Sequence, residues 1–233
     1  MSARVVPDDE VGRGEAVDVL RRGGIVALPT DTVYGIAVAV STPGGIERLF
    51  AAKRRPPDKG IMLLLDDAAQ AADAGLMTPA ATALAEAGWP GGLTVVVPQR
   101  PDVRWPAVLT GGAETIGLRV PAHDAPRALA RGVGPLPTTS ANVSGLPEAM
   151  DAAAIVEQLG DAVDLVLDGG PAHGGPASTV VDCTGSSPRI LRVGAIPLVE
   201  IAAILDRAGV EHDLATDPDG PPGEGRLTRG RAS

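Results

Sequence analysis

The sequence contains a single cysteine, Cys183, among its 233 residues. One thiol cannot build an internal disulfide framework or a thiolate metal cluster, and this composition suits a reducing cytosol. Its setting in "STVVDCTG" predicts a small buried strand residue rather than a reactive nucleophile. We therefore expect neither disulfide bonds nor zinc-thiolate chemistry.

Aromatic residues are equally scarce, since Tyr34, Phe50, Trp89 and Trp105 are the whole set. They are too few for a platform on which single-stranded bases stack. The formal net charge of -9 also argues against a surface that grips nucleic acid throughout, because such surfaces need clustered lysine and arginine. A local basic cleft and weak tRNA binding remain open.

Several other features are missing from the chain. No run reaches the roughly 20 apolar residues of a membrane span, and "MSARVVPDDE" has no apolar signal region, so we expect a cytoplasmic protein without a membrane partner. The P-loop, the G-x-G-x-x-G turn and the H-E-x-x-H zinc motif are absent. His123, His173 and His212 are scattered, so a histidine-based triad is not expected.

The domain organisation follows from length and composition. Residues 1–208 carry regular apolar patterns and fit one domain. Residues 209–233 fill with Gly, Pro and Asp and cannot bury enough apolar surface to offset chain entropy. We predict a catalytic domain over 1–208 and a disordered tail over 209–233.

Helical and strand patterns alternate along the domain. Helices are expected from Glu10 to a glycine cap at Gly23, from an N-cap at Thr42 to about Arg54, and near 68–74, 80–87, 125–131, 151–160 and 198–208. Strands are expected at 25–29, 33–40, 61–65, 93–98, 115–121, 164–170, 178–183 and 189–194, with 135–142 extended. This pattern indicates an α/β fold, and the short turns between several strands predict a mixed sheet.

Basic residues concentrate in "FAAKRRPPDKGIMLLL", residues 50–65. The stretch holds the only two lysines, Lys53 and Lys59, together with Arg54 and Arg55. A helix C-terminus stabilises one or two cations. It does not explain a cluster held by consecutive prolines before a strand, where like charges repel without a polyanion. Phosphate groups are the predicted ligand.

Polar residues interrupt two other apolar strands. Thr30, Asp31 and Thr32 follow "IVALP" and form either a turn satisfied by its own hydrogen bonds or part of a cavity. Arg119 lies alone in "TIGLRVP", where it needs a bidentate carboxylate or an internal acidic partner. Asp182, on a later strand, is expected to be structural rather than a metal ligand.

A run of neutral hydrogen-bond donors follows a short apolar segment in "PLPTTSANVSG", residues 135–145. Such side chains suit phosphate or ribose oxygens, or they cap the next helix. The donors in this run are Thr138, Thr139, Ser140, Asn142 and Ser144. The segments "ASTVVD" and "ILRVGAIP" add Ser178, Thr179 and Arg192, each a weak signal alone.

Taken in order, "PTDTVYG", "KRRPPDKG", "GLRVP", "TTSANVSG" and "STVVD...ILRVGAIP" resemble the YrdC-like family, the threonylcarbamoyl-AMP synthases, over about residues 8–205. Within that family, "KRRPPDKG" is similar to the short, single-domain bacterial branch. The resemblance implies a twisted mixed sheet flanked by helices, with a concave basic cavity. The anion expected at the basic stretch is then the ATP triphosphate.

The activity that this resemblance implies is that of a nucleotidyltransferase, L-threonylcarbamoyladenylate synthase. Such an enzyme joins L-threonine, bicarbonate or CO2, and ATP, and releases pyrophosphate. Its product supplies the group that a separate threonylcarbamoyl transferase complex places on adenosine beside the anticodon of tRNA. We expect Mg2+ to accompany ATP, held mainly by phosphates and waters, and no protein metal ligand is assigned.

The resemblance also implies roles at the nucleotide. The family's signature falls on Lys53, Arg55, Ser140 and Asn142, which are the expected catalytic residues and would grip the phosphates. Two further nucleotide contacts would come from Thr115 and Arg192.

For L-threonine, the matching positions are Thr30, Arg119 and Ser178. Arg119 would clamp the carboxylate, in agreement with its isolated place in a strand. Three further residues are placed near the site by the same resemblance: Tyr34, Arg54 and Lys59.

Two features depart from the family pattern. Many relatives carry a histidine in the strand after the basic stretch, which reads "IMLLL" here, so no histidine role is carried over. Two-domain relatives also have a second C-terminal domain, for which this chain has only its short tail. The expected mechanism, in which a threonine carbamate attacks the α-phosphorus of ATP, relies on positioning and charge stabilisation.

Three other functions are left open by the sequence. A non-catalytic tRNA or ribosomal-RNA binding protein could use the same cleft, although the acidic total and scarce aromatics count against it. A carbamoyl-transfer maturation enzyme shares the fold but would need partner domains. A riboflavin-pathway synthase would need an acidic metal-binding motif that the sequence lacks.

Overall fold

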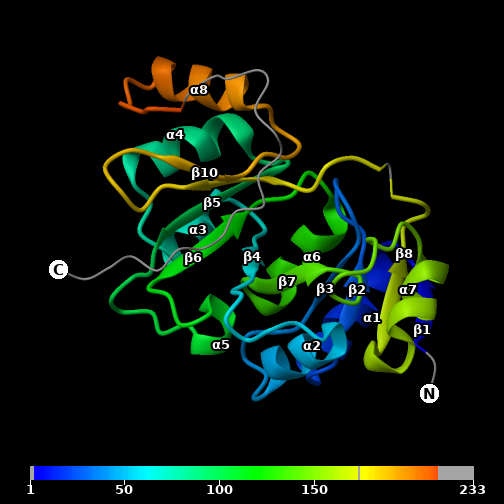
Figure 1. Ribbon diagram of the computed structural model, residues 1–233. Helices are drawn as coiled ribbons and strands as arrows, with labels where there is room; N and C mark the ends of the chain where they lie inside the picture. The colour runs from blue at the N-terminus through cyan, green and yellow to red at the C-terminus, as the bar shows by residue number, and fades with distance from the viewer. Residues whose placement is uncertain (1–2, 173, 215–233) are drawn as a thin grey trace.

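The protein is described by a computed structural model covering residues 3–172 and 174–214. Within these ranges, ten strands form one sheet in the order β1-β8-β2-β3-β7-β4-β6-β5-β9-β10. Helices pack on both sides of the sheet (Figure 1). The predicted α/β class with a twisted mixed sheet is therefore confirmed.

The strands are short and pair in both directions. The central run β2-β3-β7-β4 is antiparallel, β4 and β6 are parallel, and β5 lies between antiparallel β6 and parallel β9. Their bounds are β1 (Arg4–Pro7), β2 (Val26–Leu28), β3 (Gly35–Ala37), β4 (Met62–Leu64), β5 (Leu93–Pro98), β6 (Thr115–Arg119), β7 (Leu136–Ser140), β8 (Leu165–Asp168), β9 (Thr179–Asp182) and β10 (Arg189–Arg192).

The helices mostly match their sequence signals. Asp9, Asp67, Thr78 and Asp151 each accept a backbone N–H at the start of a helix, as N-cap residues do. The bounds are α1 (Glu10–Arg21), α2 (Gly45–Lys53), α3 (Ala68–Ala74), α4 (Pro79–Gly88), α5 (Ala107–Thr110), α6 (Asp124–Val133), α7 (Ala152–Leu159), the 3-10 turn η1 (Gly160–Ala162) and α8 (Leu198–Arg207).

The predicted start of α2 was wrong. The helix begins at Gly45, and its N-cap is Gly44 rather than Thr42, without a side-chain cap. The carbonyl of Thr42 accepts the Gly45 N–H in a turn. Gly44 lies in the left-handed region at φ 69°, which glycine adopts without strain, so the chain turns there before the helix starts. β1 and α5 were not predicted.

Alternating residues of the sheet enter two hydrophobic cores. On β2, Val26 and Leu28 pack with α1 and α6 in the smaller core, whereas Ala27 faces the larger core on the other side. The larger core collects apolar residues of α2, α3, α4, α7 and α8. Both faces are thus covered at the β2 end, which explains why these strands read as uninterrupted apolar runs.

The same alternation places polar groups on one face farther along the sheet. On β6, Ile116 and Leu118 enter the larger core, while Thr115, Gly117 and Arg119 line a cavity on the opposite face. Successive strand side chains point to opposite faces. The cavity therefore lies on the side of the smaller core.

The C-terminal end of the described chain packs against the body of the protein. Val210 and Leu214, beyond α8, contact the larger core. The predicted tail over 209–233 falls mainly on residues 215–233, which lie outside the described residues. None of the helices in the described ranges is long and apolar enough to cross a membrane.

Candidate active site

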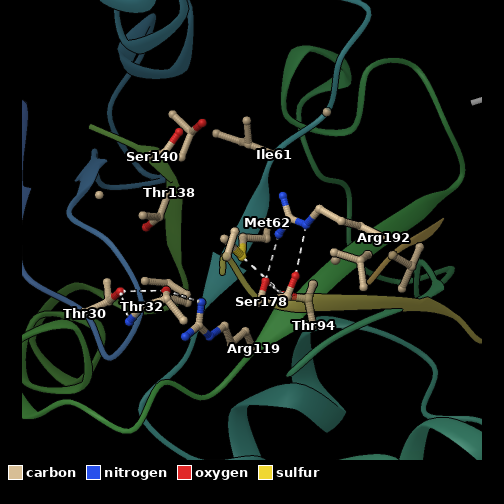
Figure 2. A pocket seen from close by; sticks show the side chains of 18 of the residues that line it. Thr30, Thr32, Ile61, Met62, Thr94, Arg119, Thr138, Ser140, Ser178 and Arg192 are labelled. Atoms are coloured by element: carbon tan, nitrogen blue, oxygen red, sulfur yellow. Dashed lines mark hydrogen bonds between the residues drawn. The ribbon is translucent and has the colours of Figure 1, made fainter. Parts of the chain in front are cut away.

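A cavity of about 330 Å³ lies over β4, β5, β6, β7 and β9, within the size range of small-molecule sites. Its lining includes three arginines and one acid, Glu148, among the described residues. Seven of the nine residues assigned catalytic or binding roles from the sequence line it: Thr30, Arg55, Thr115, Arg119, Ser140, Ser178 and Arg192. Figure 2 shows Ser140 on one side of the cavity and Arg192 on the other.

Arg119 is buried at 2% exposure and its guanidinium is held by three protein groups. Nε donates to the Gly91 carbonyl at 2.9 Å, Nη1 to Thr32 Oγ1 at 3.2 Å, and Nη2 to Asp31 Oδ1 at 2.7 Å. The internal ion pair that the sequence left open is therefore present, through one carboxylate oxygen. A guanidinium has five N–H donors, so two remain for a ligand in the cavity.

The turn after β2 satisfies itself and also faces the cavity. Thr30 Oγ1 donates to the Val33 carbonyl at 2.6 Å and accepts the Thr32 N–H at 3.1 Å. Thr32 Oγ1 lies 3.1 Å from Thr30 Oγ1 and accepts from Arg119. The segment is therefore both a turn that satisfies its own hydrogen bonds and part of the cavity wall. Thr32 connects Thr30 to Arg119 through hydrogen bonds.

Ser178 and Arg192 are directly linked on the other side of the cavity. Arg192 Nε donates to the Ser178 carbonyl at 3.0 Å, and Nη2 donates to Ser178 Oγ at 3.1 Å. Ser178 Oγ also lies 2.8 Å from Thr94 Oγ1 on β5. The structure thus couples a residue assigned to the nucleotide with one assigned to threonine.

Lys53 lies behind Ser140 rather than in the cavity lining. Its side chain is 2% exposed, and Nζ donates to the carbonyls of Ser140 and Asn142 and, at 2.9 Å, to Asn142 Oδ1. The Lys53 carbonyl also accepts the Ser144 N–H. The lysine at the end of α2 thereby fixes the turn that carries Ser140, and its predicted phosphate contact stays a prediction.

Asn142 completes this arrangement from within the turn. Its Oδ1 accepts from Lys53 Nζ and from Ser140 Oγ, the latter at 2.6 Å. Its Nδ2 donates to the carbonyls of Val143 and Leu146. Every polar atom of this amide is therefore satisfied, so Asn142 holds the turn and does not line the cavity.

The surroundings of Lys53 disfavour the charged form of its side chain. Burial, with the nearby Arg55 guanidinium, lowers the pKa of Lys53 to about 8, while the Glu148 carboxylate opposes this shift. At neutral pH the ammonium is still mostly protonated. Its charge becomes adjustable within the range in which enzymes operate, as at many functional sites.

The remaining cations of the basic stretch point in different directions. Arg55 lines the cavity, donates to the carbonyls of Lys59 and Gly60 at 2.9 and 2.7 Å, and lies over Phe50. Arg54 and Lys59 are exposed. The structure therefore brings one of these four cations into the cavity lining and one directly behind it.

Tyr34 and Thr115, also placed near the site from the sequence, differ in their surroundings. The Tyr34 hydroxyl donates to the Gly170 carbonyl at 2.6 Å and accepts the Gly169 N–H, so it anchors the chain after β8. Both residues line the cavity, with Thr115 at the start of β6.

Several lining residues were assigned no site role from the sequence, among them Met62, Thr94 and Glu148. Thr94 stands alone among apolar residues in "LTVVVP", the same signal that identified Arg119. Met62, on β4, lines the cavity near Thr94. Glu148 carried no distinguishing signal, because its loop has no regular pattern.

Other sequence expectations can be checked outside the cavity. Cys183 is buried beside β9, as predicted, and burial raises the pKa of its thiol to about 12. Asp182 accepts from Thr184 and Arg189 and is structural. His123 caps α6 and His212 pairs with Asp206, whereas His173 lies outside the described residues.

Comparisons with known proteins place the chain in a family. A family model for the Sua5, YciO and YrdC proteins, described as "Telomere recombination", matches residues 18–194. A protein of Mycobacterium tuberculosis named putative threonylcarbamoyl-AMP synthase is 39% identical, over 82% of this chain and 87% of its own length. A Bacillus subtilis protein named threonylcarbamoyl-AMP synthase is 35% identical over 89% of this chain.

Solved structures agree with these sequence matches. The structure of Pyrococcus abyssi Sua5 complexed with L-threonine superposes with a TM-score of 0.81 at 32% identity, over 91% of this chain and 62% of that one. The present chain likewise spans 60% of the Bacillus subtilis relative. The family model nevertheless spans every residue that lines the cavity, and the chain belongs to the Sua5, YciO and YrdC family.

Proposed function

We propose that the protein is an L-threonylcarbamoyladenylate synthase, a nucleotidyltransferase acting on L-threonine, bicarbonate or CO2, and ATP. The observation that carries the proposal is the convergence of Arg119, Ser178, Arg192 and Ser140 on one cavity. The relatives of this chain bear this name, and in the cavity Arg119 and Ser178 would supply donors for a carboxylate while Arg192 would supply donors for phosphates.

L-Threonine would lie between β6 and β9. The two free N–H groups of Arg119 and the hydroxyl of Ser178 would bind its carboxylate, and Thr30 and Thr32 lie beside them. Arg192 would contact the nucleotide while its bonds to Ser178 keep it next to the amino acid. This placement favours reaction because linked residues hold both substrates in fixed positions relative to each other.

The proposed reaction proceeds in two balanced steps. The threonine amine attacks the carbon of CO2 and loses a proton, which gives a carbamate. A carbamate oxygen then attacks the α-phosphorus of ATP, and the bond to the bridging oxygen breaks as pyrophosphate leaves. The chain's cations would stabilise the charge that shifts onto the phosphates, with Arg55 and Arg192 in the cavity lining and Lys53 behind Ser140.

Mg2+ is expected to enter with ATP. Within the described residues no cluster of three or more acidic, histidine or cysteine side chains could hold a metal, and Glu148 is the one carboxylate found in the cavity lining. We expect an ion held mainly by phosphates and waters, which would neutralise triphosphate charge when bound. The product would pass to a separate transferase complex that acts on tRNA.

The decisive experiment is pyrophosphate release from ATP, Mg2+ and bicarbonate, with and without L-threonine, using L-serine as a control substrate. Release that requires threonine and bicarbonate is the expected result. Arg119→Lys keeps the charge but loses the planar fork, and it should raise KM for threonine at least about tenfold. Arg127→Lys, on α6 outside the cavity, is the matched control. A wild-type protein that binds tRNA but releases no pyrophosphate would favour the RNA-binding alternative.

A further inference from the structure

A buried hydroxyl pair lies on the cavity floor where β5 meets β9. Thr94 is 3% exposed and Ser178 is 1% exposed, although both line the cavity. Their Oγ atoms are 2.8 Å apart, and Figure 2 shows the pair beside Arg192. β5 and β9 are parallel neighbours paired at Leu93 and Thr179, so the backbone fixes this contact between residues 84 positions apart.

The polarity of the pair follows from the surrounding donors and acceptors. Arg192 Nη2 donates to Ser178 Oγ, because a guanidinium cannot accept. The Thr94 hydrogen has two acceptors within reach, Ser178 Oγ at 2.8 Å and Met62 Sδ at 3.6 Å. A hydroxyl oxygen is the stronger acceptor and the nearer one, since a thioether accepts only weakly. On this ground Thr94 is assigned as the donor to Ser178.

This direction determines what Ser178 can offer to a ligand. Its oxygen has two acceptor sites, and the hydrogens from Arg192 and Thr94 occupy both of them. Its own hydrogen is then left to point into the cavity. Ser178 becomes a donor there, suited to an oxygen anion and unsuited to an ammonium or another donor.

We propose that Thr94 is a positioning residue that fixes the Ser178 hydroxyl as a hydrogen-bond donor toward the carboxylate of the amino-acid substrate. This rests on the proposed function, since that function supplies the carboxylate. Without the Thr94 hydrogen, an acceptor site of Ser178 stays empty in a buried place. The hydroxyl then rotates among several partners, and the substrate loses part of a charge-assisted hydrogen bond.

The test measures the dissociation constant of L-threonine by calorimetry and, in parallel, that of ATP. Thr94→Val keeps the side-chain shape without the hydroxyl and should weaken threonine binding about five- to tenfold, whereas Thr94→Ser should stay within about twofold. ATP affinity should be unchanged in both. Thr110→Val is the matched control, because Thr110 also lines the cavity but its hydroxyl contacts only the Ala107 carbonyl.

A double-mutant cycle separates positioning from a general packing effect. If Thr94 acts through Ser178, then adding Thr94→Val to Ser178→Ala should weaken threonine binding no further. An equal loss in both backgrounds, or full affinity in the single variant, would overturn the proposal. Thr94→Ala serves the same comparison if valine disturbs the fold, which thermal unfolding reports. Absence of threonine binding by the wild-type protein would instead overturn the proposed function and this role with it.

Discussion

The buried Lys53 ammonium makes the stability of the protein depend on pH in a defined direction. The pKa of Lys53 is lowered from 10.5 to about 8 by burial and by Arg55. Each pKa unit corresponds to about 1.4 kcal/mol, so keeping the charge inside the folded protein costs about 3 kcal/mol. The unfolded chain binds this proton more tightly between pH 8 and pH 10.5, so stability rises as pH increases through that window.

The perturbation that isolates this effect is Lys53→Met, which keeps an unbranched side chain of similar length but cannot titrate. Other groups, including Cys183, titrate in both proteins and cancel in the difference. The free energy of unfolding of the wild type minus that of the variant should rise by about 2 kcal/mol between pH 8 and pH 10. Urea titrations followed by the fluorescence of Trp89 and Trp105 would measure it.

A difference that stays flat or falls over this range would refute the reasoning. It would mean that the oxygens of Ser140 and Asn142, which accept from Nζ, favour the ammonium more strongly than burial and Arg55 oppose it. Lys53→Arg is a useful companion variant, because its guanidinium stays charged throughout and its difference from Lys53→Met should be independent of pH.

Three further predictions concern other residues. The affinity for MgATP should fall above pH 8 as Lys53 loses its charge, and Lys53→Arg should abolish that fall in calorimetric titrations. Native Cys183, whose pKa is raised to about 12 by burial, should react with a disulfide reagent at pH 8 at least about a hundredfold more slowly than the unfolded chain; an equal rate would contradict its burial. Gly194→Ala would place Cβ 2.0 Å from the Ala177 carbonyl oxygen, so it should lower stability by about 2 kcal/mol or more and weaken threonine binding through the displaced Ser178. Gly14→Ala, with no atom within 4 Å of the new Cβ, is its control in the same thermal-unfolding assay.

The same dipeptide at two helix starts shows where local sequence reasoning holds. Thr78 and Pro79 begin α4, which covers the helix predicted near 80–87, with the threonine hydroxyl accepting the Ala81 N–H. Thr42 and Pro43 carry the same signal, but the Gly44 that follows takes a positive φ and moves the helix start to Gly45. A cap signal is therefore reliable only where the next residues continue the helix.

The candidate site shows a similar division. Arg119 could be identified because it is a cation in an apolar strand, whereas Ser178 was assigned through the family resemblance; both line the cavity. Thr94 carried the same signal, but its importance comes from a contact with Ser178 that depends on strand pairing. Lys53 was grouped with Arg54 by sequence proximity, although the structure buries Lys53 at the end of α2 and leaves Arg54 exposed.

The sequence by itself determined the alternation of helices and strands, the buried character of the strands, and the residue types available for binding anions, because these depend on side-chain periodicity and chemistry within short windows. Only the tertiary structure decided which donors meet. The sheet order brings β4, β6, β5 and β9 side by side from distant parts of the chain, and this pairing joins Thr94 to Ser178 and sets the polarity of the hydroxyl that faces the cavity. Hydrogen-bond direction depends on all neighbours of an atom at once, and local sequence does not contain those neighbours.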